Sequence, residues 1–523
     1  MQKNRLRALP LLLFALLLPA MALRDFTPSN ELRYLSIADE ALADGNFFAF
    51  TNQGAPYADK PPLYLWIVMA GRALLGEGCM WFLALFSFVP ALVILRTMDR
   101  WVAARLDEPT RFSGALMLMS CGLFLGLAVF LRMDMLMCMF ITLALHTFWQ
   151  MYRSGGHPGR SRQALFAAYV FLALFTKGPV GVLVPLVATA AFLAAKRQLR
   201  TIGRYWGWTA WGVLLGGCAL WFSAVWIEGG AEYLDNLLFH QTLDRAVDAF
   251  HHKEPFYYYF ISMWWSLAPW SLLVIGLIAA ALIRRERLEE HEQFFLTVIL
   301  STIGMLSLFS SKLAVYLAPA FPFFIYLGIS LLARTRKNGW LAAAVMLPTL
   351  VWCAALPAAA VLSGREELAF LRDGRLIAAA AILTLSGCAT LWLAIRRPTL
   401  HGAIDTLAGG LLLSLFVGGF ALPRLNDRIG YGPLCREAQA AAAQLPAGSA
   451  CEYFVWRMHR PESMDVYLGR DVTEVSAEEI LAGRCAGGIL MLPARRLHDA
   501  PELKRFLAGR ECRPVGEHLA VRL

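Results

Sequence analysis

The sequence predicts a polytopic α-helical membrane protein with a small soluble α/β domain at its C-terminal end. Of the 523 residues, 58% are hydrophobic and only 16% are charged. An average soluble domain has about 45–50% apolar and about 25% charged residues. The mean hydropathy is +0.53, and apolar runs recur at the length of about 20 residues that crosses a bilayer. These observations exclude an ordinary soluble enzyme.

Apolar segments of membrane-spanning character recur along the first four fifths of the chain. The first follows Lys3, Arg5 and Arg7, and we interpret it as an uncleaved span rather than a signal peptide. About 13 transmembrane helices are expected, at 8–23, 79–95, 112–131, 135–151, 164–176, 179–195, 207–227, 259–283, 294–310, 313–333, 339–362, 376–395 and 403–422. A further short helix at 61–76 is expected to be re-entrant or interfacial and is not counted among them.

The loop charges predict the orientation of these spans. Net charge is +10, but most Lys and Arg residues fall in alternate short loops, as the positive-inside rule requires. The intervening loops carry one or two cations each, such as Arg132, Lys177 and Lys312. The basic balance therefore reflects topology, and we expect no nucleic acid as a partner. The odd number of spans predicts that the tail lies outside.

The tail changes composition from about residue 424. Short apolar runs alternate there with helical patterns, which is typical of a small α/β domain. The apolar runs are at 451–456, 465–468, 488–492 and 519–523, and the helical patterns at 436–445, 477–482 and 500–508. We expect a membrane domain at 1–423, with a first outer loop at 24–78, and a soluble domain at 424–523. Four cysteines of the tail permit disulfides in three pairings: Cys435, Cys451, Cys485 and Cys512.

The first outer loop carries an unusual mixture of acids, cations and aromatic residues. Glu31, Arg33 and Tyr34 precede an amphipathic segment, and Glu31 and Tyr34 share a face of the predicted juxtamembrane helix. An acid there can deprotonate an acceptor or bind a cation. The alternative is an ordinary charged surface helix.

Asp59 and Lys60 precede two prolines. The prolines hold the chain extended and then permit a helix to begin at this point, where phosphate binding is natural. The alternative interpretation is a helix-start signal with no further role.

The remaining outer loops also carry ionisable groups. Asp134 begins the fourth span, where it is either a helix cap, a partner of Arg132 or a second carboxylate of a site. His251 and His252 can supply a ligand to a divalent metal. Three further residues are helix-end anchors or phosphate contacts: Lys177, Lys312 and Tyr316.

Taken in order, six short motifs resemble the aminoarabinose transferase (ArnT-like) family, whose wider group includes protein O-mannosyltransferases. The resemblance covers roughly the first 330 residues, and the motifs are specific as a set rather than singly. Asn30 stands where the family usually has Asp, and Asp59 where it usually has Glu. The motifs are NELRY at 30–34, YADKPP at 57–62, RMD at 132–134, TKGP at 176–179, HHKEPF at 251–256, and Ser311-Lys312-Leu313 with Tyr316-Leu317 and Pro319.

The resemblance implies a GT-C fold and a polyprenyl-phosphate-linked sugar donor. It places Glu31 and Asp134, with Asn30 beside them, in the catalytic pocket. It implies a divalent metal ion, zinc or magnesium, between Asp59 and one of His251 and His252. Residues expected to face the donor phosphate are Arg33, Lys60, Tyr57, Lys312, Tyr316 and Lys177.

We therefore expect an inverting glycosyltransferase of a bacterial inner membrane, with its site and its tail in the periplasm. The donor would be an undecaprenyl-type phosphate sugar, and the acceptor lipid A or another envelope glycolipid. A protein hydroxyl, as in mannosyltransferases, is the alternative acceptor. A lipid or glycolipid transporter is the alternative of another class, but its charges should lie near the bilayer midplane rather than in outer loops.

Overall fold

A computed structural model describes residues 5–155, 159–238, 253–444 and 451–523. The chain divides into two compact units. The first comprises Met1–Leu18, Tyr57–Tyr64 and Ala84–Gly418, and the second Pro19–Pro56, Leu65–Leu83 and Gly419–Leu523. The first is helical, and the second contains the juxtamembrane segments and the tail. The expected domain limit at residues 423 and 424 stays a prediction.

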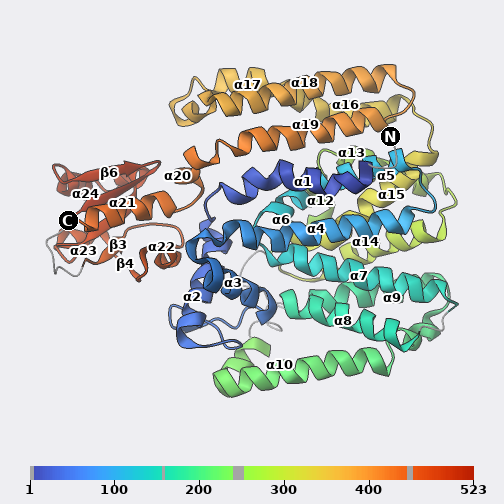
Figure 1. Cartoon of the computed structure of the whole chain (residues 1–523), viewed down its shortest axis with the longest axis horizontal. Coiled ribbons are helices and arrows are strands. Elements are labelled where there is room, and N and C mark those ends of the chain that lie inside the picture. Colours follow the sequence, from blue (N-terminus) through green and yellow to red (C-terminus); the bar gives the residue numbers. More distant parts are fainter. Residues whose placement is uncertain (1–4, 156–158, 239–252, 445–450) are drawn as a thin grey trace. The chain divides into compact units, whose positions relative to one another are not determined.

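Long apolar helices make up the first unit (Figure 1). A short 3-10 segment, η6 (Ala314–Ala320), leads into α15. The helices are α1 (Arg5–Ala22), α4 (Met80–Val102), α5 (Glu108–Met119), α6 (Gly122–Val129), α7 (Met133–Arg153), α8 (Arg160–Lys177), α9 (Val180–Ala195), α10 (Trp208–Asp235), α12 (Tyr258–Ser266), α13 (Ser271–Ile283), α14 (Glu290–Leu308), α15 (Phe321–Arg334), α16 (Gly339–Cys353), α17 (Ala355–Leu362), α18 (Gly374–Arg396) and α19 (His401–Gly419).

Every expected span is helical. By length and composition, however, fewer than the expected thirteen helices could cross a membrane. Within the described residues, nine helices are long and apolar enough to cross a membrane, or ten if the bent pair α5 and α6 counts as one span. Three expected spans fall short. α8 carries Arg160, Arg162 and Lys177, α9 has only 16 residues, and the segment at 259–283 is broken into α12 and α13. Apolarity alone does not reveal such breaks.

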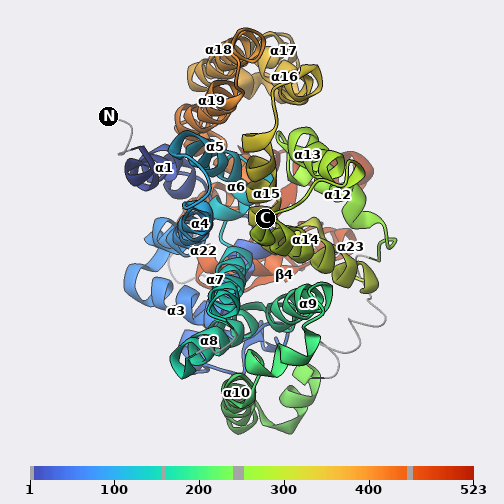
Figure 2. The same cartoon turned by 90° about the vertical axis from the view of Figure 1, so that its right-hand side faces the viewer.

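Aromatic side chains pack between α4, α7, α9 and α14. The ring centroids of Phe148 and Phe294 lie 5.7 Å apart, those of Phe192 and Phe294 4.9 Å, and those of Trp101 and Phe295 5.1 Å. Each such pair stabilises packing by about 0.5–1.5 kcal/mol beyond its buried area. Figure 2 shows α7 to α10 as one group and α16 to α19 as another, with α14 and α15 between them. The C-terminal part of α7 is therefore packed against α14, which also contacts α4 and α9.

The second unit contains short helices and two sheets. Its first part has η2 (Pro28–Leu32), α2 (Arg33–Asp44), a two-stranded ribbon and most of α3 (Pro62–Leu75), as expected for a juxtamembrane helix followed by a short apolar one. The ribbon is β1 (Thr51–Asn52) with β2 (Ala55–Pro56). The tail contributes α20 (Asn426–Ile429), α21 (Gly432–Ala442), β3 (Tyr453–Val455), α22 (Asp465–Leu468), β4 (Val472–Glu474), α23 (Ala477–Leu481), β5 (Ile489–Pro493), α24 (Pro501–Leu507), β6 (Cys512–Val515) and β7 (His518–Arg522).

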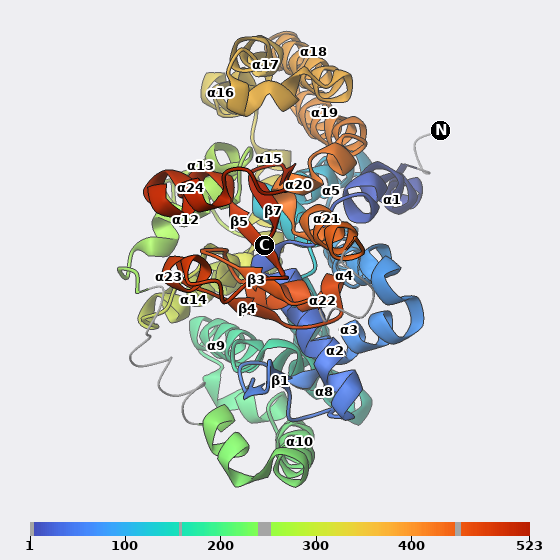
Figure 3. The same ribbon diagram turned by 90° about the vertical axis from the view of Figure 1, so that its left-hand side faces the viewer.

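The tail forms a five-stranded mixed sheet in the order β4-β3-β5-β7-β6 (Figure 3). β3 is parallel to β4 and β5, whereas β7 is antiparallel to β5 and β6. Leu490 and Leu492 pack with Ile480 of α23 and Leu503 of α24 in one apolar core, while α21 packs against β5 and β7. The expectation of a small α/β tail is confirmed.

Two details of the tail differ from expectation. The run at 465–468 is the helix α22 rather than a strand. Oδ1 of Asp465 accepts a hydrogen bond from the amide of Val466 at 2.7 Å, and Gly469 ends the turn at φ 66°. The permitted disulfides are not formed, since all ten cysteines, including the four of the tail, are free thiols.

Candidate active site

The first turn of α7 holds a buried carboxylate between two cations. Asp134 is only 1% exposed. Its Oδ2 accepts a hydrogen bond from Nε of Arg132 at 2.9 Å, and its Oδ1 pairs with the ammonium of Lys177. The cap position of α7 is Arg132, so the interpretation of Asp134 as the helix cap is wrong. The ion pair with Arg132, one of the alternatives for Asp134, is confirmed, and a carboxylate held in this way stays charged and fixed in direction.

The connection between α8 and α9 positions Lys177. Gly178 has φ 98°, a conformation that favours glycine, and it ends α8 directly after Lys177. A Cβ atom on Gly181 would lie 2.3 Å from the carbonyl carbon of Ala173, so only glycine lets α9 approach α8 this closely. Across the turn, the Lys177 ammonium lies 4.9 Å from the ring centroid of Tyr316, within range of a cation–π attraction.

A cavity of about 310 Å³ lies beside this cluster. One part of its lining is polar, with Asp59, Lys60, Lys177, Ser311 and Tyr316. The remainder is mostly apolar and comes from α7, α8, α9, α10 and α14: Met137, Leu174, Val180, Leu183, Cys218, Trp221, Phe222, Leu237, Leu238, Leu306 and Phe309. No sequence pattern distinguishes Trp221 and Phe222 as site residues, because aromatic residues near a span end also suit a membrane interface.

Asp59 and Lys60 reach the cavity from the segment that precedes α3. Lys60 Nζ lies 3.2 Å from Asp59 Oδ2, and the hydroxyl of Tyr57 lies 3.4 Å from the same oxygen. The hydroxyl of Tyr233 in α10 donates to the carbonyl of Tyr57 at 2.7 Å. As expected from the two prolines, the helix begins at Pro62. The structure therefore brings Asp59 and Lys60 together with Lys177 and Tyr316, from distant parts of the sequence.

Lys312 is placed differently from Lys60 and Lys177. It is 3% exposed, and its ammonium donates to the carbonyls of Glu254 at 2.8 Å and Phe309 at 2.5 Å. These contacts join the end of α14 to the segment before α12. The hydrogen bonds of the Lys312 ammonium are thus made to backbone carbonyls.

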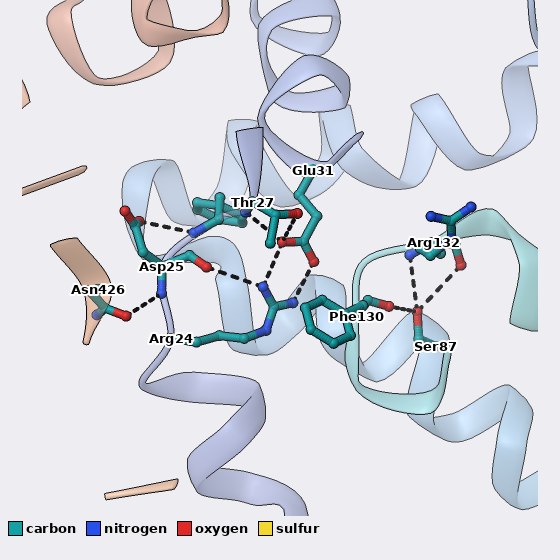
Figure 4. A network of polar contacts seen from close by, with 9 residues as sticks. Arg24, Asp25, Thr27, Glu31, Ser87, Phe130, Arg132 and Asn426 are labelled. Carbon is teal, nitrogen blue, oxygen red and sulfur yellow. Dashed lines mark hydrogen bonds and ion pairs between the residues drawn. The ribbon is translucent and has the colours of Figure 1, made fainter. Parts of the chain in front are cut away.

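Glu31, in the second unit, forms its own buried network (Figure 4). Its oxygens accept hydrogen bonds from Nη1 and Nη2 of Arg24 at 2.6 and 2.5 Å. They also accept from the amide and the hydroxyl of Thr27, at 2.8 and 2.9 Å. Sequence reasoning missed Arg24, which looks like an ordinary cation at the end of the first apolar run. Next to it, the amide of Asp25 donates to Oδ1 of Asn426 at 2.8 Å.

The other two predicted residues of this segment lie beside Glu31. Asn30 is half-buried in η2, and its carbonyl accepts the amide of Arg33. The Arg33 guanidinium lies 5.9 Å from the ring centroid of Tyr34, and Tyr34 is buried in α2.

The predicted metal ligands are only partly within the residues that the structure describes. Asp59 is paired with Lys60, and the described residues contain no group of three or more His, Cys, Asp or Glu side chains suited to a metal. His251 and His252 lie outside the described residues. Of the predicted ligands, the structure thus describes only Asp59, and the metal site stays a prediction.

No family model matches the chain. An undecaprenyl phosphate-α-4-amino-4-deoxy-L-arabinose arabinosyl transferase 1 of Pseudomonas fluorescens is 26% identical over 473 residues, which cover 85% of this chain and 79% of that protein. A second transferase of that name from another strain is 26% identical over 62% of this chain, and the match spans about half (56%) of its length.

A solved structure decides the fold. The crystal structure of ArnT from Cupriavidus metallidurans bound to undecaprenyl phosphate superposes with a TM-score of 0.75 at 17% identity. It covers 99% of this chain and 97% of that chain. This chain therefore has the helical GT-C membrane fold of ArnT, and it is a multi-pass membrane protein. Its sequence is distantly similar to the ArnT-like transferases over most of its length. Those relatives are lipid-phosphate-sugar-dependent glycosyltransferases.

Proposed function

We propose that this ArnT-like chain is an inverting glycosyltransferase that moves a sugar from an undecaprenyl-type phosphate to lipid A or another envelope glycolipid. The reaction would occur at the periplasmic face of a bacterial inner membrane. The observation that carries the proposal is the cavity beside α7, in which two lysines meet long apolar walls. A lipid phosphate needs both: cations for its head and an apolar surface for its chain.

The cations suit the charge change of such a reaction. When the bond between the sugar and the phosphate oxygen breaks, negative charge grows on the leaving phosphate. Lys60 and Lys177 line the cavity and are held in place by Asp59 and Asp134. Fixed cations at the place where charge develops stabilise the transition state without reorganisation. The lipid phosphate is already a good leaving group, so no strong general acid is required.

Hydrogen-bond capacity favours Asp134 over Glu31 as the group that receives the acceptor's proton. A carboxylate offers about four lone-pair sites. Glu31 already accepts four hydrogen bonds from Arg24 and Thr27. Asp134 accepts one from each of Arg132 and Lys177, so it retains capacity for an acceptor hydroxyl. We assign Glu31 and Asn30 to positioning the juxtamembrane segment.

Lys312 fits a supporting part better than a direct phosphate contact, because its ammonium is engaged by two carbonyls. Tyr316 and Lys177 remain proposed donor contacts. Arg33 and Tyr57 are proposed as further contacts on the basis of the family resemblance. The metal ion expected at Asp59 stays a prediction, and no step is routed through it.

Transfer with purified protein tests the proposal. The protein in liposomes, given undecaprenyl-phosphate sugars and lipid A, should yield glycosylated lipid A detectable by mass spectrometry. Asp134→Asn should lower turnover by about a hundredfold to ten-thousandfold, the contribution of a positioned base. Because the change also leaves two cations uncompensated, melting temperature is measured alongside, and Asp134→Glu should keep the fold.

Asp471→Asn, an exposed acid of the tail, is the matched control and should keep full activity. Undiminished turnover by Asp134→Asn would remove the assigned role. Failure of every lipid-phosphate donor would overturn the proposed reaction. Envelope lipids of a deletion strain, compared by mass spectrometry with those of the parent, would then name the sugar that is lost.

A further inference from the structure

A second polar cavity lies at the opposite end of α7 from Asp134. It has a volume of about 420 Å³ and is lined by residues of α4, α7 and α8. Asp134 is the second residue of α7 and Arg153 is its last, in a helix of 21 residues. At a rise of 1.5 Å per residue, these positions are about 30 Å apart along the axis. That distance is the thickness of the hydrocarbon core, so the two cavities face opposite membrane surfaces.

The lining combines exposed arginines with buried indoles. Arg100 of α4, Arg153 of α7 and Arg162 of α8 converge here from three helices. Trp101 and Trp149 line the same cavity, and they are only 4% and 6% exposed. The bundle thus presents guanidinium groups beside a fixed apolar surface at the ends of its spans.

The charge of this cavity is mostly uncompensated. Its lining residues include no acid. Arg153 pairs with Glu290 at 2.9 Å. Within the part of the chain that the structure describes, Arg100 and Arg162 form no ion pair or side-chain hydrogen bond. Two guanidinium groups therefore remain available for an anion, and guanidinium suits phosphate because it donates two parallel hydrogen bonds.

We propose that this cavity binds the phosphate of an anionic phospholipid head group, of the phosphatidylglycerol type. The level of the cavity in the membrane favours a lipid over a free ion, since the arginines lie at helix ends, where lipid head groups are found. The indoles offer a surface for the glycerol and the first methylenes of the acyl chains. This site is separate from the proposed sugar-transfer cavity and does not depend on that reaction.

Native mass spectrometry of the delipidated full-length protein tests the proposal. Phosphatidylglycerol and phosphatidylethanolamine are titrated separately into wild type and into the double variant Arg100→Gln/Arg162→Gln. Wild type should retain phosphatidylglycerol preferentially. Near an anionic surface each arginine contributes about a fivefold gain in affinity, so the double variant should lose about thirtyfold. Arg284→Gln removes an exposed arginine at the end of α13 that does not line this cavity, and should bind as wild type.

Equal binding of phosphatidylglycerol by wild type and the double variant would overturn the site. Equal retention of both lipids would overturn the role of charge. Displacement of phosphatidylglycerol by millimolar inorganic phosphate would show a free-anion site instead. If the double variant does not fold, Arg162→Gln alone should give about a fivefold loss, and an unchanged affinity in that variant would also contradict the proposal.

Discussion

At the scale of single residues, the candidate site is nearly balanced in charge. The cations Lys60, Lys177 and Arg132 face the carboxylates Asp59 and Asp134, which leaves one net positive charge. A sugar–phosphate–lipid donor is a phosphodiester with one negative charge. After transfer, the phosphate monoester carries about 1.5 to 2 negative charges at neutral pH. The site therefore matches the donor at the start and stabilises the additional charge as it develops.

Removing one cavity cation should weaken the donor rather than the fold. Lys60→Ala should raise the KM for the donor by about tenfold to a hundredfold, because a hydrogen bond to a charged group is worth about 1.5–3 kcal/mol. Lys60→Arg should retain most of the affinity, and Lys504→Ala, an exposed change on α24, should have no effect. The measurement is steady-state kinetics with binding of undecaprenyl phosphate. Unchanged donor affinity in Lys60→Ala would argue against the phosphate contact.

Sequence reasoning succeeded at this scale where partners are close in the chain. Arg132 and Asp134 are two residues apart, and their pair was one of the alternatives considered for Asp134. Lys177, the partner that connects Asp134 to the cavity lining, is 43 residues away, and nothing local indicates it. Asp134 was also considered as a possible helix cap. Only the geometry at the start of α7 excludes that interpretation. Arg24 was missed because a buried ion pair and an ordinary span-end cation look alike in sequence.

At the scale of elements, hydropathy located each helix but not its interruptions. The bend of 69° between α5 and α6 and the break between α12 and α13 lie inside apolar runs that read as continuous spans. In the tail, α22 was taken as a strand because a run of four residues is too short to show helical periodicity. It belongs to a junction with α2, where the hydroxyl of Ser36 donates to Oδ2 of Asp465 at 2.6 Å.

This junction should make stability depend on pH. Burial raises the pKa of Asp465 from 3.8 to about 6. The folded state then binds the proton more tightly than the unfolded state, so the stabilisation is fully present below about pH 4 and is lost as pH rises through about 6. Asp465→Asn removes the titrating group. Between pH 4 and pH 7, the melting temperature of wild type should fall relative to that of Asp465→Asn. Parallel curves for the two proteins would show that Asp465 titrates normally.

At the scale of the whole molecule, the likeness to ArnT is a likeness of fold that extends over the entire chain. Identity to the ArnT structure is only 17%, yet 99% of the chain superposes. The short motifs indicated the resemblance because they contain the charged residues of the outer loops. At such positions a catalytic or binding role allows few residue types. The remaining helices share the fold without sharing sequence, since many apolar side chains fill a bundle equally well.

A bound metal is a prediction for the complete protein. If Asp59 and a histidine at 251 or 252 hold zinc, the purified protein should contain about one zinc ion, and Asp59→Asn should reduce that content when measured by mass spectrometry of the elements. Chelation should lower transfer and zinc should restore it. Full activity in protein shown to be metal-free would contradict the prediction, whatever the effect of Asp59→Asn.

Gly181 gives a means of recognising distant relatives. Its missing side chain lets the backbone of α9 lie against Ala173 and Leu174, where an added carbon would meet main-chain atoms that cannot swing aside. A genome search that demands a lysine followed four positions later by glycine, at the hairpin between two apolar helices, would select chains able to build this corner even after overall similarity has faded.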